Sequence, residues 1–164
     1  MQIRRSEAHR KALFLRPDEL DRSIALVLLA ARGFEAAGAE DVPRGLAPVH
    51  RLVLLLLKSG MITTAADLKT LLGAPKQTVS RYVQQLDVAG LVEREDAVND
   101  RRRKLLRLTA RGQDVAERLD RGQRRRLAAV FKTHGPAAVA DFEAVLLDLV
   151  EPRVRPFLDD EATT

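Results

Sequence analysis

The sequence predicts a mainly α-helical fold with one small β-hairpin. Aromatic residues make up only 4% of the chain, so the core must consist mainly of Leu, Val and Ala, which at helical spacing usually pack helix against helix. Apolar residues recur at this spacing over most of the chain, whereas residues 91–108 contain two short β-compatible stretches. At 164 residues, a single compact domain, 1–164, is expected.

Composition excludes several classes of protein. Cysteine is absent, which rules out disulfides, thiolate metal sites and redox sensing by thiols. The longest apolar runs, residues 24–31 and 52–57, are much shorter than the ~20 residues that cross a bilayer. The charged start is not followed by the apolar stretch of a signal peptide. We therefore expect a cytoplasmic protein with no membrane partner.

The balance of charge favours a polyanionic partner. The formal net charge is +5, and Lys and Arg side chains displace the counterions that condense on nucleic acid. The densest basic runs are residues 101–104 and 124–126. The second run fits an exposed face of a long helix and is not assigned to DNA.

Two helices are predicted in the first part of the chain. Pro17 suits the first position of a helix and is followed by two acidic residues. Apolar residues then repeat at helical spacing as far as Phe34. Residues 37–45 form a connector by their Gly and Pro content, and a second helix begins near Pro48. This second helix is apolar nearly all round, so we expect it to be buried.

Two short helices joined by a turn come next. Thr64 is a good N-cap for a helix over residues 65–72, which Gly73 ends. Pro75 can open the following helix, which Gly90 stops. Two short helices with a glycine-containing turn predict a helix-turn-helix.

A β-hairpin is predicted after the helix-turn-helix. Residues 91–95 and 104–108 have the pattern of two short strands, and residues 96–103 between them form a loop rich in Asp, Asn and Arg. The hairpin is therefore a wing with a charged tip.

A long helix should follow the hairpin. Thr109 can cap it, Gly122 could bend it, and Gly135 with Pro136 should break it. A last helix over about residues 137–150 carries apolar residues on one face.

Two motifs around the wing give the sequence a family resemblance. Residues 71–94 contain the helix after the turn and the run Gly-Leu-Val-Glu-Arg that enters the wing. Residues 99–112 contain an Asp-x-Arg at Asp100 and Arg102 and a Leu-Thr-x-x-Gly exit. These stretches resemble the MarR family, and the order of the flanking helices extends the resemblance to about residues 15–155.

The resemblance implies a winged helix-turn-helix lobe over residues 46–109, flanked by N- and C-terminal dimerisation helices over residues 15–40 and 110–157. It implies a homodimer that binds double-stranded DNA sequence-specifically and regulates transcription. A two-fold protein of this kind should read a pseudo-palindromic operator.

The DNA-binding residues follow from the geometry of such a lobe. The helix after the turn presents its first residues to base edges in the major groove, where Lys and Gln have suitable hydrogen-bonding groups. By resemblance, Arg102 enters the minor groove, while Asp100 orients a neighbouring Arg, because a carboxylate would repel phosphates. The predicted DNA-binding residues are Lys76, Gln77, Thr78, Ser80, Arg81 and Gln84 in the helix and Arg101, Arg102 and Arg103 in the wing. The alternative reading of each is a solvated surface residue.

Catalysis is not expected. The histidines, His9, His50 and His134, are scattered and belong to no metal-ligand or catalytic motif, so we predict no catalytic residue and no cofactor. Two other functions stay open. One is a winged-helix module that binds only protein. The other is a metal-responsive regulator, if folding brings histidine and acidic ligands together.

Regulation by a small molecule is implied by the resemblance alone. MarR-like repressors are commonly released from DNA by anionic or aromatic effectors that bind between the dimerisation helices and the winged lobe. In this chain Arg22, His50 and Arg51 are the predicted effector partners. Arg22 equally fits an exposed position, and His50 and Arg51 equally fit the start of a helix.

Overall fold

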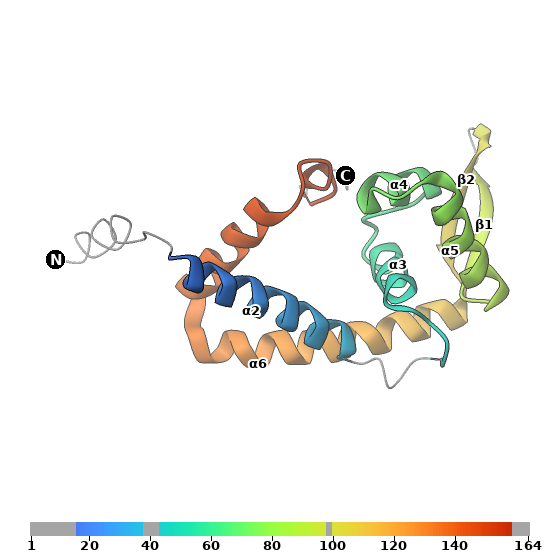
Figure 1. The fold of residues 1–164 in the computed structure, drawn as a ribbon. Coiled ribbons are helices and arrows are strands. Elements are labelled where there is room, and N and C mark those ends of the chain that lie inside the picture. Colours follow the sequence, from blue (N-terminus) through green and yellow to red (C-terminus); the bar gives the residue numbers. More distant parts are fainter. Residues whose placement is uncertain (1–15, 38–42, 98–99, 159–164) are drawn as a thin grey trace. The chain divides into compact units, whose positions relative to one another are not determined.

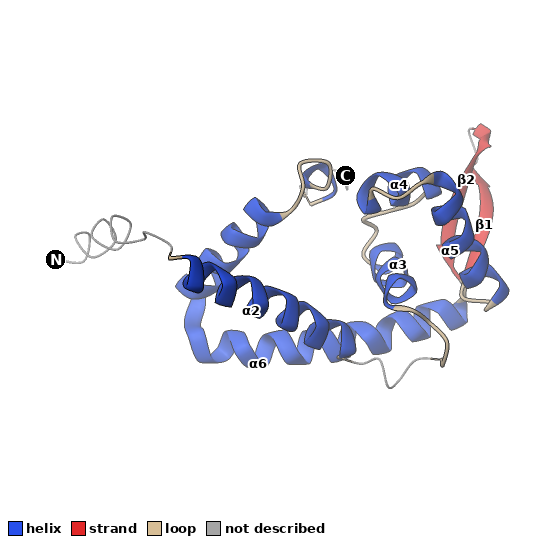
Figure 2. Ribbon diagram, viewed as in Figure 1, coloured by secondary structure: helices blue, strands red, loops and turns tan. Residues whose placement is uncertain are grey.

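A computed structural model describes residues 16–37, 43–97 and 100–158, with the backbone alone at 97 and 100–103. The chain divides into two compact units, 1–36 and 37–164. The first contains helix α2 (Pro17–Ala36). The second contains α3 (Pro48–Lys58), α4 (Ala65–Leu72), α5 (Lys76–Val88), strands β1 (Val92–Ala97) and β2 (Asp100–Leu108), α6 (Ala110–Leu149) and the short 3-10 helix η2 (Arg155–Phe157) (Figures 1 and 2). The predicted fold class is confirmed.

Helix α2 begins at Pro17, as predicted, and none of its residues is buried. Its apolar side chains face solvent to a large extent, with exposed fractions of 57% for Ile24 and 65% for Leu28. None of the helices in the described ranges is both long and apolar enough to cross a membrane.

The core of the second unit lies between α3, α4, α5, the hairpin and the first part of α6, which are grouped together in Figure 1. Helix α3 contributes Val53, Leu54 and Leu56. Leu52 on the same helix is 41% exposed, so the predicted burial holds for most of α3 but not for this residue. Helix α3 packs against α6, β2 and α5.

The two helices of the predicted helix-turn-helix begin and end close to the expected residues. The hydroxyl oxygen of Thr64 accepts a hydrogen bond from the backbone N–H of Asp67 at 3.1 Å and so caps α4. Gly73 ends α4 with φ at 59°, a left-handed conformation that favours glycine. Pro75 occupies the N-cap position of α5, so the helix begins at Lys76, one residue later than predicted.

The hairpin is longer than predicted. Its strands pair antiparallel from Val92 with Leu108 as far as Ala97 with Asp100, so much of the charged loop expected over residues 96–103 belongs to strands. The physical reason lies in opposite charges on facing strands, since Lys104 pairs with Asp96 and Arg107 with Glu95. Such cross-strand pairs favour the extended conformation.

Helix α6 has helical torsions on both sides of one break. Thr109 caps it, as predicted, by accepting a hydrogen bond from the N–H of Gly112 at 3.0 Å. Gly135 has φ of 79° and ψ of 170°, followed by Pro136, which confirms the predicted break. Gly135 is the residue with non-helical torsions inside α6, so the helix continues through Gly122, which is buried.

Candidate nucleic-acid interface

Helix α5 has one buried face and one exposed face. Val79, Val83 and Leu86 are buried at helical spacing against the core. The predicted DNA-binding residues of the helix lie on other sides, with Thr78 half-buried and the rest exposed, namely Lys76, Gln77, Ser80, Arg81 and Gln84. Burial of the apolar face therefore holds a row of polar side chains towards solvent.

The start of α5 is suited to anions. No side chain caps it, and no acidic residue lies in its first turn. The backbone N–H groups there and the positive end of the helix dipole are therefore open to a negatively charged partner. Lys76, the first residue of the helix, adds a full positive charge at the same end. This arrangement favours phosphate groups.

The wing brings charged residues into two strands. Strand β2 contains the backbone of Asp100 and of Arg101, Arg102 and Arg103, but their side chains lie outside the described part of the structure. Their DNA-binding roles, and the orienting role of Asp100, stay predictions. Lys104 and Arg107, further along β2, are paired with carboxylates of β1 and are not assigned to DNA.

The end of α5 and the start of α6 are tied together at the base of the hairpin. The hydroxyl group of Thr109 donates to the carbonyl oxygen of Gly90 at 2.7 Å. The backbone N–H of Thr109 donates to the carbonyl of Leu91 at 3.1 Å, and the guanidinium group of Arg111 donates to the carbonyl of Ala89 at 3.0 Å. These bonds fix where the wing begins relative to α5.

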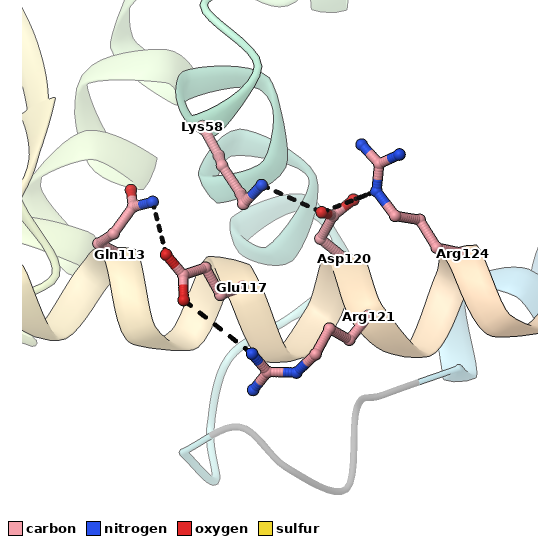
Figure 3. A network of polar contacts seen from close by, with 6 residues as sticks. All are labelled: Lys58, Gln113, Glu117, Asp120, Arg121 and Arg124. Atoms are coloured by element: carbon pink, nitrogen blue, oxygen red, sulfur yellow. Dashed lines mark hydrogen bonds and ion pairs between the residues drawn. The ribbon is translucent and has the colours of Figure 1, made fainter.

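A polar network joins α3 to α6 (Figure 3). The carboxylate of Asp120 accepts from the ammonium group of Lys58 at 3.0 Å and from the guanidinium group of Arg124 at 2.8 Å. Partial burial raises the pKa of Asp120. The hydrogen bonds from Arg124 and Lys58 lower the pKa by more than burial raises it, so the net pKa lies below its ordinary value. The ionised carboxylate therefore links α6 to α3.

The effector residues predicted from sequence have different surroundings. Arg22 is exposed on α2, in the other compact unit. Arg51 donates from Nη1 to the carbonyl oxygen of Leu46 at 3.1 Å, while its Nε is buried without a partner among the described residues. His50 is buried and has both ring nitrogens paired within the chain. An effector role for these three residues stays a prediction.

Sequence reasoning missed the contacts that join α5 to the start of α3. Gln85 and Tyr82 both contact His50, and no local signal in the sequence points to that pairing. Among the described residues, no group of three or more His, Asp and Glu side chains is placed to hold a metal ion. His134 is exposed on α6, and His9 lies outside the described residues.

Comparison with known proteins decides the family. A model of the MarR family matches residues 44–103. The HTH-type transcriptional regulator PetP of Rhodobacter capsulatus is 31% identical over 148 residues, which cover 87% of each chain. The chain belongs to the MarR family.

Solved structures share the MarR fold seen here. A putative MarR family regulator from Listeria monocytogenes, complexed with a 26mer DNA, superposes with a TM-score of 0.66 at 20% identity over 82% of this chain and 91% of that one. RV1404 from Mycobacterium tuberculosis superposes with a TM-score of 0.59 at 26% identity over 77% of this chain and 92% of that one. The segment matched by the MarR family model contains α3, α4, α5 and most of the hairpin.

Proposed function

We propose that this protein is a homodimeric transcription regulator that binds double-stranded DNA sequence-specifically and acts as a repressor released by a small molecule. The observation that carries DNA binding is the exposed polar face of α5, held outwards by the buried Val79, Val83 and Leu86. The Listeria protein of the same fold is complexed with DNA, and PetP is a transcriptional regulator.

In this proposal the start of α5 enters the major groove. Lys76 and Gln77 reach base edges, where their donors and the Gln acceptor match groups on the bases. Ser80, Arg81 and Gln84 lie further along the exposed side of the helix and bind bases or phosphates. The wing lies over the adjacent minor groove, where Arg102 binds in the negative potential.

A second copy of the chain is the proposed partner of the apolar surfaces. Helix α2 exposes Ile24 and Leu28, and the last turns of α6 expose Val145 and Leu149 at 58% and 61%. An exposed row of apolar side chains on a helix is typical of an interface. Pairing through these helices would place two copies of α5 about one DNA turn apart, ~10 base pairs, for a pseudo-palindromic operator.

The experiment that tests DNA binding begins with selection from a pool of random duplexes. The expected product is an enriched pseudo-palindrome whose affinity falls steeply as salt rises, because binding releases counterions. Gln77→Ala should change the selected bases, whereas Arg125→Ala, at an exposed position of α6 that is not assigned to DNA, should not. Recovery of no sequence, with no salt-dependent retention of duplex, would favour the protein-binding module instead.

An anionic effector is the proposed cause of release. The support is Arg51, a half-buried cation whose Nε has no partner among the described residues and would donate to a carboxylate placed beside it. Phenolic acids and acyl thioesters should be screened for release of the labelled operator. Release by one such compound, and loss of that release in Arg51→Gln, is expected. A compound that raises the melting temperature but leaves operator binding intact would contradict regulation.

A further inference from the structure

His50 is a buried histidine in the first turn of α3 that contacts α5, the recognition helix of the proposed function. Only 6% of its surface is exposed. Its Nδ1 accepts a hydrogen bond from the backbone N–H of Ala47 at 3.1 Å, and its Nε2 lies 3.0 Å from Oε1 of Gln85. Because Nδ1 is an acceptor, the neutral ring has its proton on Nε2, which donates to Gln85.

The same ring makes a second contact with α5. It meets Tyr82 edge to face, with ring centroids 5.7 Å apart and planes at 89°, a preferred arrangement for aromatic rings. Tyr82 and Gln85 are three residues apart and so lie on one side of the helix. On α5, the guanidinium carbon of Arg81 lies 5.7 Å from the centroid of Tyr82. His50 thus contacts the residue on which a predicted DNA-binding arginine rests.

Tyr82 and Gln85 are not part of the buried apolar core, to which α5 contributes other residues. A directional hydrogen bond and an edge-to-face contact define position, however, in a way that apolar packing does not. The hydrogen bond from Ala47 fixes the orientation of the ring, because its donor, the N–H of the N-cap residue Ala47, and its acceptor, Nδ1 of His50, both lie at the start of α3.

We propose that His50 is the positioning residue of the recognition helix. Its ring, oriented by Ala47, holds Gln85 and Tyr82 so that α5 presents Arg81 at one fixed angle to the operator. The proposal rests on DNA binding by α5, and it assigns His50 to the DNA-binding machinery rather than to an effector. It predicts that loss of the hydrogen bond to Gln85 lowers the ratio of operator to random-duplex affinity without a matching fall in the melting temperature.

Two substitutions separate the two ends of the ring. His50→Asn retains an acceptor near Nδ1 for the N–H of Ala47 and loses the donor to Gln85. His50→Gln retains an amide donor near Nε2 and loses the acceptor. We expect His50→Asn to lower the ratio of operator to random-duplex affinity by about fivefold, the worth of one hydrogen bond, and His50→Gln to restore most of that ratio.

A double-mutant cycle with Gln85→Ala completes the test. Gln85→Ala alone should reproduce the loss seen with His50→Asn, and the double variant should lose no more than either. Unchanged discrimination in His50→Asn and Gln85→Ala, or full additivity of their effects, would overturn the proposal. The proposal would also be overturned if discrimination fell only in step with the melting temperature and His50→Gln did not restore it.

Imidazole nitrogen chemical shifts distinguish failure of this proposal from failure of the proposed function. In the free protein, the ring of His50 should show the tautomer with the proton on Nε2, and His50→Asn should shift the amide signals of Arg81 and Tyr82. Those signals report whether His50 positions α5 even if the wild-type chain binds no duplex, so failure of positioning and failure of DNA binding are observed separately. A ring protonated on Nδ1, or unshifted α5 signals, would refute the positioning role.

Discussion

A side chain at Gly112 would overlap the carbonyl oxygen of Leu91, because a Cβ atom built on this glycine lies closer to that oxygen than real Cβ atoms ever come. The first turn of α6 therefore packs directly on the backbone at the start of the hairpin. This contact explains physically why glycine stands at the end of the Leu-Thr-x-x-Gly stretch.

Gly112→Ala should destabilise the winged lobe. The obstacle is backbone, which cannot rotate away, so α6 must shift and strain the bonds of Thr109. We expect a loss of about 1–3 kcal/mol in the free energy of unfolding, as for other overpacked sites, measured by urea denaturation. Gln113→Ala, at the exposed neighbouring position, is the control and should change the free energy by no more than about 0.5 kcal/mol. Equal stability of both variants would contradict the contact.

The Asp120 network predicts a dependence of stability on acid. The pKa of Asp120 is lowered in the folded protein, so its contribution is fully present above the unfolded pKa of about 4 and is lost as pH falls through the folded pKa. Asp120→Asn should therefore unfold more easily than wild type at pH 7, with the difference shrinking in acid. Chemical denaturation at a series of pH values measures this, with Asp114→Asn on the exposed side of α6 as control. A difference that grows in acid would have the wrong sign.

The proposed role of the wing predicts how DNA affinity depends on salt concentration. If Arg102 binds in the minor groove, Arg102→Ala should weaken binding to operator and random duplex alike and reduce the slope of log affinity against log salt by about one. Fluorescence anisotropy at several salt concentrations measures both quantities. Arg125→Ala removes the same charge from α6 and should leave the slope unchanged. An unaltered slope in Arg102→Ala would remove the wing from the interface.

The dimer prediction concerns α2. Leu28→Glu places a charge on an apolar surface that we assign to a second copy, and burial of an unpaired charge is costly. The variant should sediment as a monomer at micromolar concentration while the wild type sediments as a dimer. Val88→Glu, at an exposed position at the end of α5, is the control and should remain dimeric. A monomeric wild type that occupies DNA at one protein per site would refute the assignment.

Local signals explain what could be predicted from the sequence. Thr64, Gly73 and Thr109 act on backbone groups within a few residues of themselves, so their capping roles are visible in the order of residues. The links that escaped prediction join distant residues. His50 and Gln85 are 35 positions apart, and Lys58 and Asp120 are 62 apart.

The wing shows the same distinction. Its charged residues have low intrinsic strand propensity, so the sequence indicated a loop over residues 96–103. Only the register between the strands reveals that Asp96 faces Lys104. The side chains of Asp100 and Arg102, on which the family motif depends, lie outside the described residues, and their roles still rest on the resemblance.

The division of labour along α5 has a consequence for how relatives diverge. Val79, Val83 and Leu86 hold the helix in the core, while Gln77, Ser80 and Gln84 are exposed on its outer side. Substitutions on the outer side should cost little stability, so under the proposed function a new operator could be acquired by changing those residues. If α5 binds the operator as proposed, exchange of a few outer side chains would change the DNA sequence that the lobe recognises, provided that the inner residues and His50 stay in place.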